Sequence, residues 1–253
     1  MEIKEELKSI FYEIFHELPR KGPGSFNSTN KAYQYVKPYL RNPKILDIGC
    51  GNGKQTIDLL KISDGTITAV DNYPFFINEL NETLTREKLN HRAVAEVGDM
   101  FNLKYEDESF DLIWCEGAIY NIGFEKGLRE FKRFLKPNGF ICVSEASWFV
   151  DKPSGEVFEF WNKYYPAITS INNNLAAAES AGHKNIAHFK FPESDWLDEY
   201  YKYLSQSLDK LRGKYKNNPE ALKLFDAGQY EIEIYNKYSE EYGYLFFIMQ
   251  NES

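Results

Sequence analysis

Histidine, cysteine, methionine and long apolar runs are all rare in this sequence. Its 253 residues include 4 His, 3 Cys and 3 Met. No apolar run reaches the roughly 18 residues of a membrane-spanning helix, and the N-terminal stretch MEIKEELKSIF lacks a signal-peptide core. Cys50, Cys115 and Cys142 each lie in an apolar, strand-like run, and an odd number suits buried free thiols in a reducing compartment. These absences favour a cytoplasmic protein without a membrane partner. No His/Cys cluster has metal-ligand spacing, so we expect no metal.

Excess positive charge is also missing. Lys and Arg number 30 against 38 Asp and Glu, a net charge of -8. An acidic chain repels a phosphate backbone, which argues against nucleic acid as a partner. Apolar residues make up 43% and charged residues 27%, which excludes collagen-like, low-complexity and disordered classes.

The middle of the chain alternates between short apolar strands and helical patterns. Several strands are continuous apolar runs, as expected for parallel strands buried on both faces. The alternation predicts an α/β, Rossmann-like, doubly wound sheet. The predicted strands are Lys44–Ile48, Thr66–Val70, Ala93–Val97, Phe110–Cys115 and Gly139–Ser144, and the predicted helices between them are Lys54–Ile62, Pro74–Glu87 and Phe124–Leu135.

Helical patterns flank this region on both sides. An amphipathic helix is predicted over residues 2–18, and a second, capped by Ser28 or Asn30, through Tyr39. The C-terminal part is rich in aromatic residues. We predict one domain with three parts: an N-terminal helical cap (1–42), a core (43–147) and a helical, aromatic-rich insertion or lid (192–241). Further predicted elements are helices at 158–165 and 172–181 and strands at 185–191 and 244–249.

A glycine-rich loop follows the first predicted strand, in the sequence KILDIGCGNGKQT from Lys44 to Thr56. Glycines allow a sharp bend and close approach to a ligand because they lack a Cβ. The spacing differs from the dinucleotide fingerprint Gly-x-Gly-x-x-Gly, since Lys54 stands at the third glycine position. Asp47 precedes the loop and would favour a cationic ligand over a pyrophosphate.

Acidic residues end the next three predicted strands. Asp71 follows the second strand, where a carboxylate can accept both hydroxyls of a ribose. Asp99 and Met100 end the third strand, where they could hydrogen-bond an adenine amino group and cover its ring. Glu116 and Gly117 end the fourth. Any one of these carboxylates alone is typical of a solvated loop, but together they are hard to explain by packing.

In this order the motifs resemble the class I S-adenosylmethionine-dependent methyltransferases, in particular the small-molecule enzymes of the ubiquinone and menaquinone biosynthesis type. The resemblance covers about Pro43 to Ser147 and includes FDLIWCEG and LKPNGFICVSEA. It implies a seven-stranded sheet ordered 3-2-1-4-5-7-6, with strand 7 antiparallel, and S-adenosyl-L-methionine as cofactor, converted to S-adenosyl-L-homocysteine. The insertion before the last strand departs from the family pattern, and we expect it to form part of the acceptor site. The implied cofactor-binding residues are Asp47, Gly49, Cys50, Gly51, Gly53, Gln55, Asp71, Asn72, Asp99, Met100, Glu116 and Gly117.

Methyl transfer requires the nucleophile and the methyl carbon to be held in line, away from water. An oxygen acceptor gains from a base, and an amine must arrive unprotonated. The catalytic candidates are Glu116, Tyr120 and Glu145 at the strand ends, and Glu145 could equally form a cap or lid salt bridge. Trp148 and Asn121 lie beside them.

Two further segments have open interpretations. In RKGPGS, the backbone at Gly24 and Ser25 could bind the cofactor's carboxylate, or the segment could simply connect two helices. The aromatic residues could bind an aromatic or amine acceptor, or pack the insertion against the sheet; they are Trp148, Trp161, Tyr164, Tyr165, Trp196, Tyr200 and Tyr201.

The sequence therefore predicts methyl transfer from S-adenosylmethionine to a nitrogen or oxygen of a small molecule. A non-catalytic S-adenosylmethionine-binding regulatory module is an alternative, and a nicotinamide-dependent oxidoreductase is a weaker one because the fingerprint glycine is missing. The aromatic tail could also supply a homodimer contact.

Overall fold

A computed structural model describes the backbone of residues 5–252 and the side chains from Leu7 onward. Residues 2–4 of the predicted first helix lie outside this range. Its described part, α1, spans Glu5–Phe15. No helix within residues 5–252 is long and apolar enough to cross a membrane.

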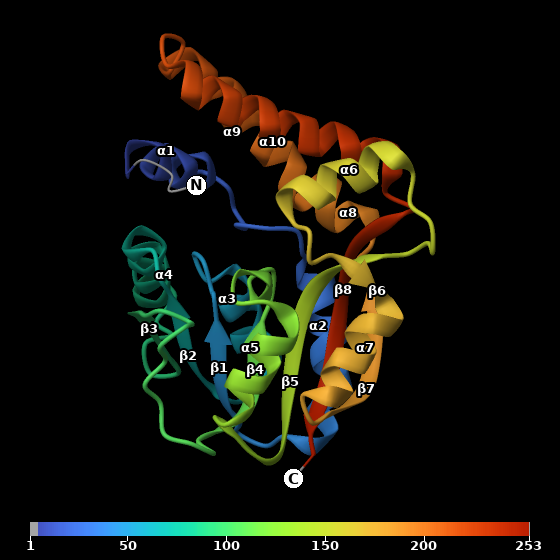
Figure 1. The fold of residues 1–253 in the computed structure, drawn as a ribbon. Coiled ribbons are helices and arrows are strands. Elements are labelled where there is room, and N and C mark those ends of the chain that lie inside the picture. The colour runs from blue at the N-terminus through green and yellow to red at the C-terminus, as the bar shows by residue number, and fades with distance from the viewer. Residues whose placement is uncertain (1–4, 253) are drawn as a thin grey trace.

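The core is one sheet whose main path runs in the order β3-β2-β1-β4-β5-β8-β7 (Figure 1). Strand β8 is antiparallel to both neighbours, and the other pairs are parallel. This confirms the predicted order, with one short strand, β6, added beside β5. The strands are β1 Lys44–Ile48, β2 Thr66–Asp71, β3 Ala93–Val97, β4 Phe110–Cys115, β5 Leu135–Trp148, β6 Thr169–Ser170, β7 His183–Lys190 and β8 Tyr242–Asn251.

Helices cover both faces of the sheet because alternate strand residues point to opposite sides. In β1, Ile45 packs with the core formed by α2, α3 and α4, whereas Leu46 packs with the core formed by α5 and α7. The same alternation holds in β4, between Trp114 and Ile113. These helices span α2 Phe26–Val36, α3 Lys54–Ile62, α4 Pro74–Arg86, α5 Phe124–Lys132 and α7 Ile171–Ser180.

A third group of helices lies above the carboxyl ends of the parallel strands (Figure 1). It combines α1 with the segments that precede β6 and β8, so the predicted cap and insertion meet in space. Helices α9 and α10 lie side by side, and α1 packs against both. The group includes α6 Gly155–Tyr164, α8 Glu193–Trp196, a π-helix Leu197–Tyr201, α9 Lys202–Lys214 and α10 Pro219–Tyr238.

Several predicted boundaries were wrong, including both ends of α2 and of β5. The cap of α2 is Ser25, whose Oγ accepts the Ser28 N–H at 3.2 Å, and the helix ends at Val36 before a 3-10 turn. Strand β5 begins at Leu135, which pairs with Phe110, and a register shift against β4 accommodates the extra residues before Phe140. It continues to Trp148 because pairing with β8 extends that far.

Candidate active site

A cavity of about 590 Å³ lies over the carboxyl ends of β1, β2, β3, β4 and β5. Its floor is the sheet edge and its remaining walls come from α1, the segment before α2, α6, the π-helix and α10. One end is lined by the glycine loop and the ends of β2 and β3. The other end is lined by aromatic side chains and two carboxylates.

The glycine loop depends on backbone conformations that only glycine adopts easily. Gly49, Gly51 and Gly53 have φ angles of +72°, +54° and +76°. A Cβ on Gly49 would lie 2.3 Å from the Ala118 Cβ. Gly49, Cys50, Gly51 and Gln55 line the cavity, whereas Gly53 caps α3 against Leu80 and does not.

Asp47 lies beneath this loop and does not line the cavity, contrary to the prediction that it faces the cofactor. Alternation along β1 turns its side chain toward α3, where Thr56 Oγ1 donates to Oδ2 at 2.5 Å and Gln55 Nε2 donates to Oδ1 at 3.5 Å. Burial raises the pKa of Asp47 to about 7. Asp47 therefore holds the start of α3 under the loop.

The ends of β2 and β3 bring two carboxylates to the cavity. The Gly51 N–H donates to Asp71 Oδ2 and the Tyr73 N–H donates to Asp71 Oδ1, both at 2.9 Å. The Phe101 N–H donates to Asp99 Oδ1 at 3.0 Å. Each carboxylate keeps acceptor capacity for a ligand. Asn72 and Met100, which the sequence assigns to the cofactor, line the cavity beside them.

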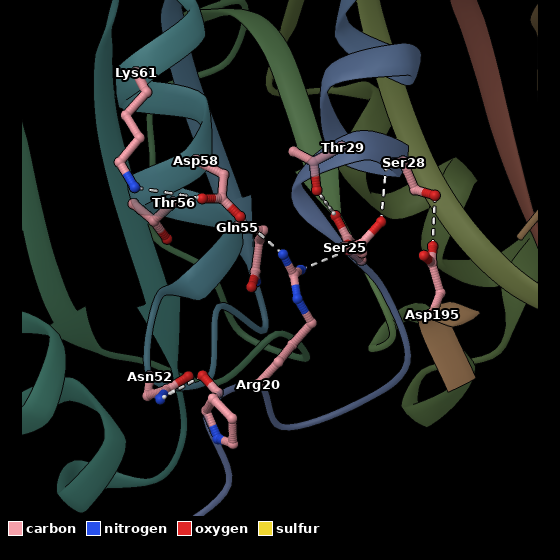
Figure 2. Close-up of polar contacts among 12 residues, drawn as sticks. Arg20, Ser25, Ser28, Thr29, Asn52, Gln55, Thr56, Asp58, Lys61 and Asp195 are labelled. Atoms are coloured by element: carbon pink, nitrogen blue, oxygen red, sulfur yellow. Dashed lines mark hydrogen bonds and ion pairs between the residues drawn. The ribbon is translucent and has the colours of Figure 1, made fainter. Parts of the chain in front are cut away.

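Glu116 is held in a buried network instead of being presented as a base. Arg20 Nη1 donates to Oε1 at 2.7 Å, and Trp114 Nε1 and Thr29 Oγ1 donate to Oε2 at 3.0 and 3.1 Å. Arg20 also pairs with Asp58 at 2.9 Å, and Figure 2 shows its side chain reaching between α2 and α3. These partners occupy both carboxylate oxygens, which argues against the catalytic role and the cofactor-binding role expected for Glu116.

Gly24 and Ser25 lie behind the cavity wall, which is lined by Lys21, Gly22 and Pro23. The Gly24 N–H donates to the Asp195 carbonyl at 3.2 Å, and Ser25 caps α2. Gly24 thus connects the segment before α2 to α8, and Ser25 begins α2. The expectation that their backbone binds the cofactor's carboxylate does not fit this placement.

Glu145 is a buried carboxylate of the cavity with one unpartnered oxygen. It is 2% exposed; its Oε1 accepts the Ala146 N–H at 2.9 Å, and its Oε2 has no hydrogen-bond partner. Burial raises its pKa to about 8, although the neighbouring Tyr165 hydroxyl and the Ala146 N–H partly lower it. A carboxyl group with such a pKa can exchange a proton near neutral pH.

Around Glu145 lies a region that we call the acceptor chamber. The sequence did not indicate Glu231, because α10 carries no motif and only folding brings it over the cavity. It also did not indicate Tyr244, which lies near the start of β8. The predicted aromatic residues Trp148 and Tyr201 lie outside the lining, and Trp148 packs against Tyr242 and Phe158 instead. The acceptor chamber is lined by Tyr120, Glu145, Trp161, Tyr164, Tyr165, Trp196, Tyr200, Glu231 and Tyr244.

The charges of the lining suit a cationic cofactor. Five acidic side chains line the cavity: Asp71, Asp99, Glu116, Glu145 and Glu231. Among the described residues only Arg20 and Lys21 add positive charge, and both are paired, Lys21 with Glu79 at 3.2 Å. The sulfonium of S-adenosylmethionine is cationic, so the residues present fit this group.

Comparison with known proteins shows which family the chain belongs to. Residues 40–207 match a family model described as a methyltransferase domain. The demethylmenaquinone methyltransferase of Staphylococcus haemolyticus is 29% identical over 83% of this chain and 89% of its own length. The 27-O-demethylrifamycin SV methyltransferase of Amycolatopsis mediterranei is 25% identical over 81% and 75%.

Solved structures agree in fold. A Geobacter sulfurreducens S-adenosylmethionine-dependent methyltransferase, solved with S-adenosyl-L-homocysteine, superposes with a TM-score of 0.81 at 16% identity, covering 96% of this chain and 98% of the other. The family model spans well over half of the chain. The chain therefore belongs to the methyltransferase domain family and is an S-adenosylmethionine-dependent methyltransferase.

Proposed function

We propose that this methyltransferase acts on a nitrogen or oxygen atom of a small molecule bound in the acceptor chamber. The observation that carries the proposal is Glu145, a buried carboxyl group with an unpartnered oxygen in the same cavity as the glycine loop. A small molecule bound in the acceptor chamber would have the atom that receives the methyl group beside the Glu145 carboxylate, which can take up its proton.

The cofactor would occupy the other end of the cavity. We propose that the loop backbone faces the methionine part, that Asp71 and Asn72 hold the ribose, and that Asp99 and Met100 frame the adenine. The direction of Asp71 is already fixed by its two backbone donors, which limits its reorganisation on binding. The proposed cofactor-binding residues that line the cavity are Gly49, Cys50, Gly51, Gln55, Asp71, Asn72, Asp99, Met100 and Gly117.

When bound, S-adenosylmethionine supplies a methyl group whose bond to sulfur breaks as the acceptor's lone pair bonds to the methyl carbon, leaving neutral S-adenosylhomocysteine. Glu145 Oε2 takes the proton that the acceptor atom loses. Tyr120 lies edge-to-face against Tyr165, with ring centroids 5.9 Å apart, and positions the acceptor. The aromatic walls exclude water from the reacting atoms.

A labelled-methyl assay with a panel of small amines, phenols, alcohols and carboxylic acids tests the proposal. We expect product with the label on nitrogen or oxygen, and Glu145→Gln should lower kcat while leaving the S-adenosylhomocysteine Kd within twofold. Glu159→Gln, an exposed change on α6, is the control. Label on carbon would contradict the proposal; cofactor binding without turnover of any compound would favour the regulatory alternative.

The cytoplasmic location and the homodimer stay predictions.

A further inference from the structure

The acceptor chamber has the chemistry of a site for an organic cation. We propose that its acceptor is an aliphatic amine, protonated in water, whose ammonium group lies between Glu145 and Glu231 and whose carbon substituents pack on the surrounding aromatic rings. This inference rests on the proposed function, because the amine nitrogen is the atom that would receive the methyl group.

The first support is the unsatisfied oxygen of Glu145. A buried carboxylate without a partner is costly, and a ligand that donates a hydrogen bond or carries positive charge would offset that cost. The side chain is 2% exposed and Oε2 has no partner among the described residues. An ammonium group supplies both the charge and the donor.

The second support is Glu231, on a different element of the chamber. It lies on α10, its Oε1 accepts the Tyr201 hydroxyl at 3.0 Å, and it lines the same cavity. Burial raises its pKa to about 6, and the Tyr201 hydroxyl partly lowers it. A neutral alcohol or phenol needs one proton acceptor at most, so a second carboxylate is better explained by a charged ligand.

Two phenols connect these carboxylates. Burial is the main cause that raises the pKa of Tyr120 and Tyr244, and the negative charges of both Glu145 and Glu231 raise it further. Both phenols therefore lie within electrostatic range of both carboxylates. Their rings, with those of Trp161, Tyr165 and Tyr200, offer the π faces that attract organic cations.

Positive charge is absent from this end of the cavity in the part of the chain that the structure describes. The two cations of the lining, Arg20 and Lys21, are engaged elsewhere, with Glu116 and Asp58 and with Glu79. Lys21 Nζ also donates to the Phe15 carbonyl at 2.8 Å. An anionic acceptor would thus meet two carboxylates and no counter-charge.

The chemistry balances with groups already present. The ammonium N–H bond breaks, its proton moves to Glu145 Oε2, and its electron pair stays on nitrogen. That lone pair then forms the bond to the methyl carbon as the sulfur–carbon bond breaks. The product is the methylated ammonium ion, which leaves the reaction already carrying a positive charge, and Glu231 keeps its negative charge and holds that ion.

Calorimetry with two matched probes tests the binding without turnover. Choline carries a trimethylammonium group, which has no proton and cannot accept another methyl on nitrogen. The alcohol 3,3-dimethylbutan-1-ol has the same shape without the charge. Titrated at pH 8.5 into protein saturated with S-adenosylhomocysteine, choline should bind at least tenfold more tightly than the alcohol. Glu231→Gln should weaken choline binding about tenfold and change alcohol binding less than twofold.

Glu233→Gln is the matched control, because Glu233 lies on α10 with an exposed side chain, and it should leave both affinities unchanged. Equal affinities, tighter binding of the alcohol, or no binding of choline would each overturn the inference. If S-adenosylhomocysteine binds in those cases, the proposed function still stands. If S-adenosylhomocysteine does not bind, the proposed function fails and the inference fails with it.

Discussion

Arg20 and Glu116 form a buried ion pair, with Nη1 and Oε1 2.7 Å apart and side chains 5% and 2% exposed. The pair joins the segment that walls one side of the cavity to the carboxyl end of β4. The same guanidinium reaches Asp58 on α3 at 2.9 Å. One cation thus balances two buried carboxylates, and it fixes the N-terminal segment over the sheet edge.

Replacing Arg20 should lower the free energy of unfolding. In Arg20→Met, Glu116 and Asp58 lose their shared partner, and an uncompensated buried charge typically costs about 3–5 kcal/mol. Urea denaturation measures the change. The matched control is Lys61→Met, because Lys61 also pairs with Asp58, at 3.7 Å, but is 53% exposed; a loss of less than about 1 kcal/mol is expected there. Equal losses of unfolding free energy in the two variants would show that the buried Arg20 network does not stabilise the protein more than an exposed ion pair does.

A methyl group added to the glycine loop should strain it. Gly49→Ala puts a side chain at φ +72° and a Cβ 2.3 Å from the Ala118 Cβ. We expect a loss of about 2–4 kcal/mol in unfolding free energy, from positive φ and overpacking together, and weaker S-adenosylhomocysteine binding by calorimetry. The double variant Gly49→Ala/Ala118→Gly should recover the part of this loss in unfolding free energy that comes from the contact between the two Cβ atoms.

Gly213→Ala serves as the control for this change, because Gly213 lies in α9, where an added Cβ would meet no packed group within 4 Å. Its stability should stay the same or rise by up to about 1 kcal/mol, since alanine restricts the unfolded chain. If Gly49→Ala were as stable as Gly213→Ala, the conformation assigned to the loop would be wrong.

The sheet was predictable because its signals are local. Continuous apolar runs, a glycine turn and acidic residues at strand ends appear within a few residues of each other, and they fix both the parallel strands and the edge where the cavity forms. Boundaries were less predictable where tertiary pairing decides them. Leu135 pairs with β4 only because the extra residues that follow it in β5 are accommodated by a register shift. The two-residue β6 exists only through its pairing with β5.

The site was predictable only where its residues belong to the sheet edge. Asp71, Asp99 and Glu145 follow directly from strand positions. Glu231 does not, because its role depends on how α10 folds over the sheet, and nothing in its neighbouring sequence marks it. The roles of Arg20 and Asp47 depend on which way the side chain turns, and there only the structure reveals the partners.

Asp71 should contribute to cofactor affinity. Its carboxylate is held by the Gly51 and Tyr73 N–H groups, and losing hydrogen bonds to a charged group costs about 1–3 kcal/mol. Asp71→Ala should therefore raise the S-adenosylhomocysteine Kd by about 5–150-fold in calorimetry. Asp107→Ala, an exposed carboxylate paired with Arg133, is the control. Unchanged affinity in a folded Asp71→Ala protein would place the ribose elsewhere.

Glu145 should make the stability of the ligand-free protein depend on pH. Its pKa rises from an ordinary 4.5 to about 8 on folding, because burial disfavours the charge. Between these values the side chain is ionised in the unfolded chain and protonated in the folded protein, so the contribution of Glu145 to stability falls as pH rises and levels off above about 8. Glu145→Gln does not titrate, so its Tm relative to the unsubstituted protein should increase from pH 5 to pH 8. Thermal unfolding by circular dichroism across this range measures the difference, and Glu233→Gln should show none. A difference for Glu145→Gln that stays constant with pH would mean that the carboxyl group ionises normally, and that its unpartnered oxygen is open to water.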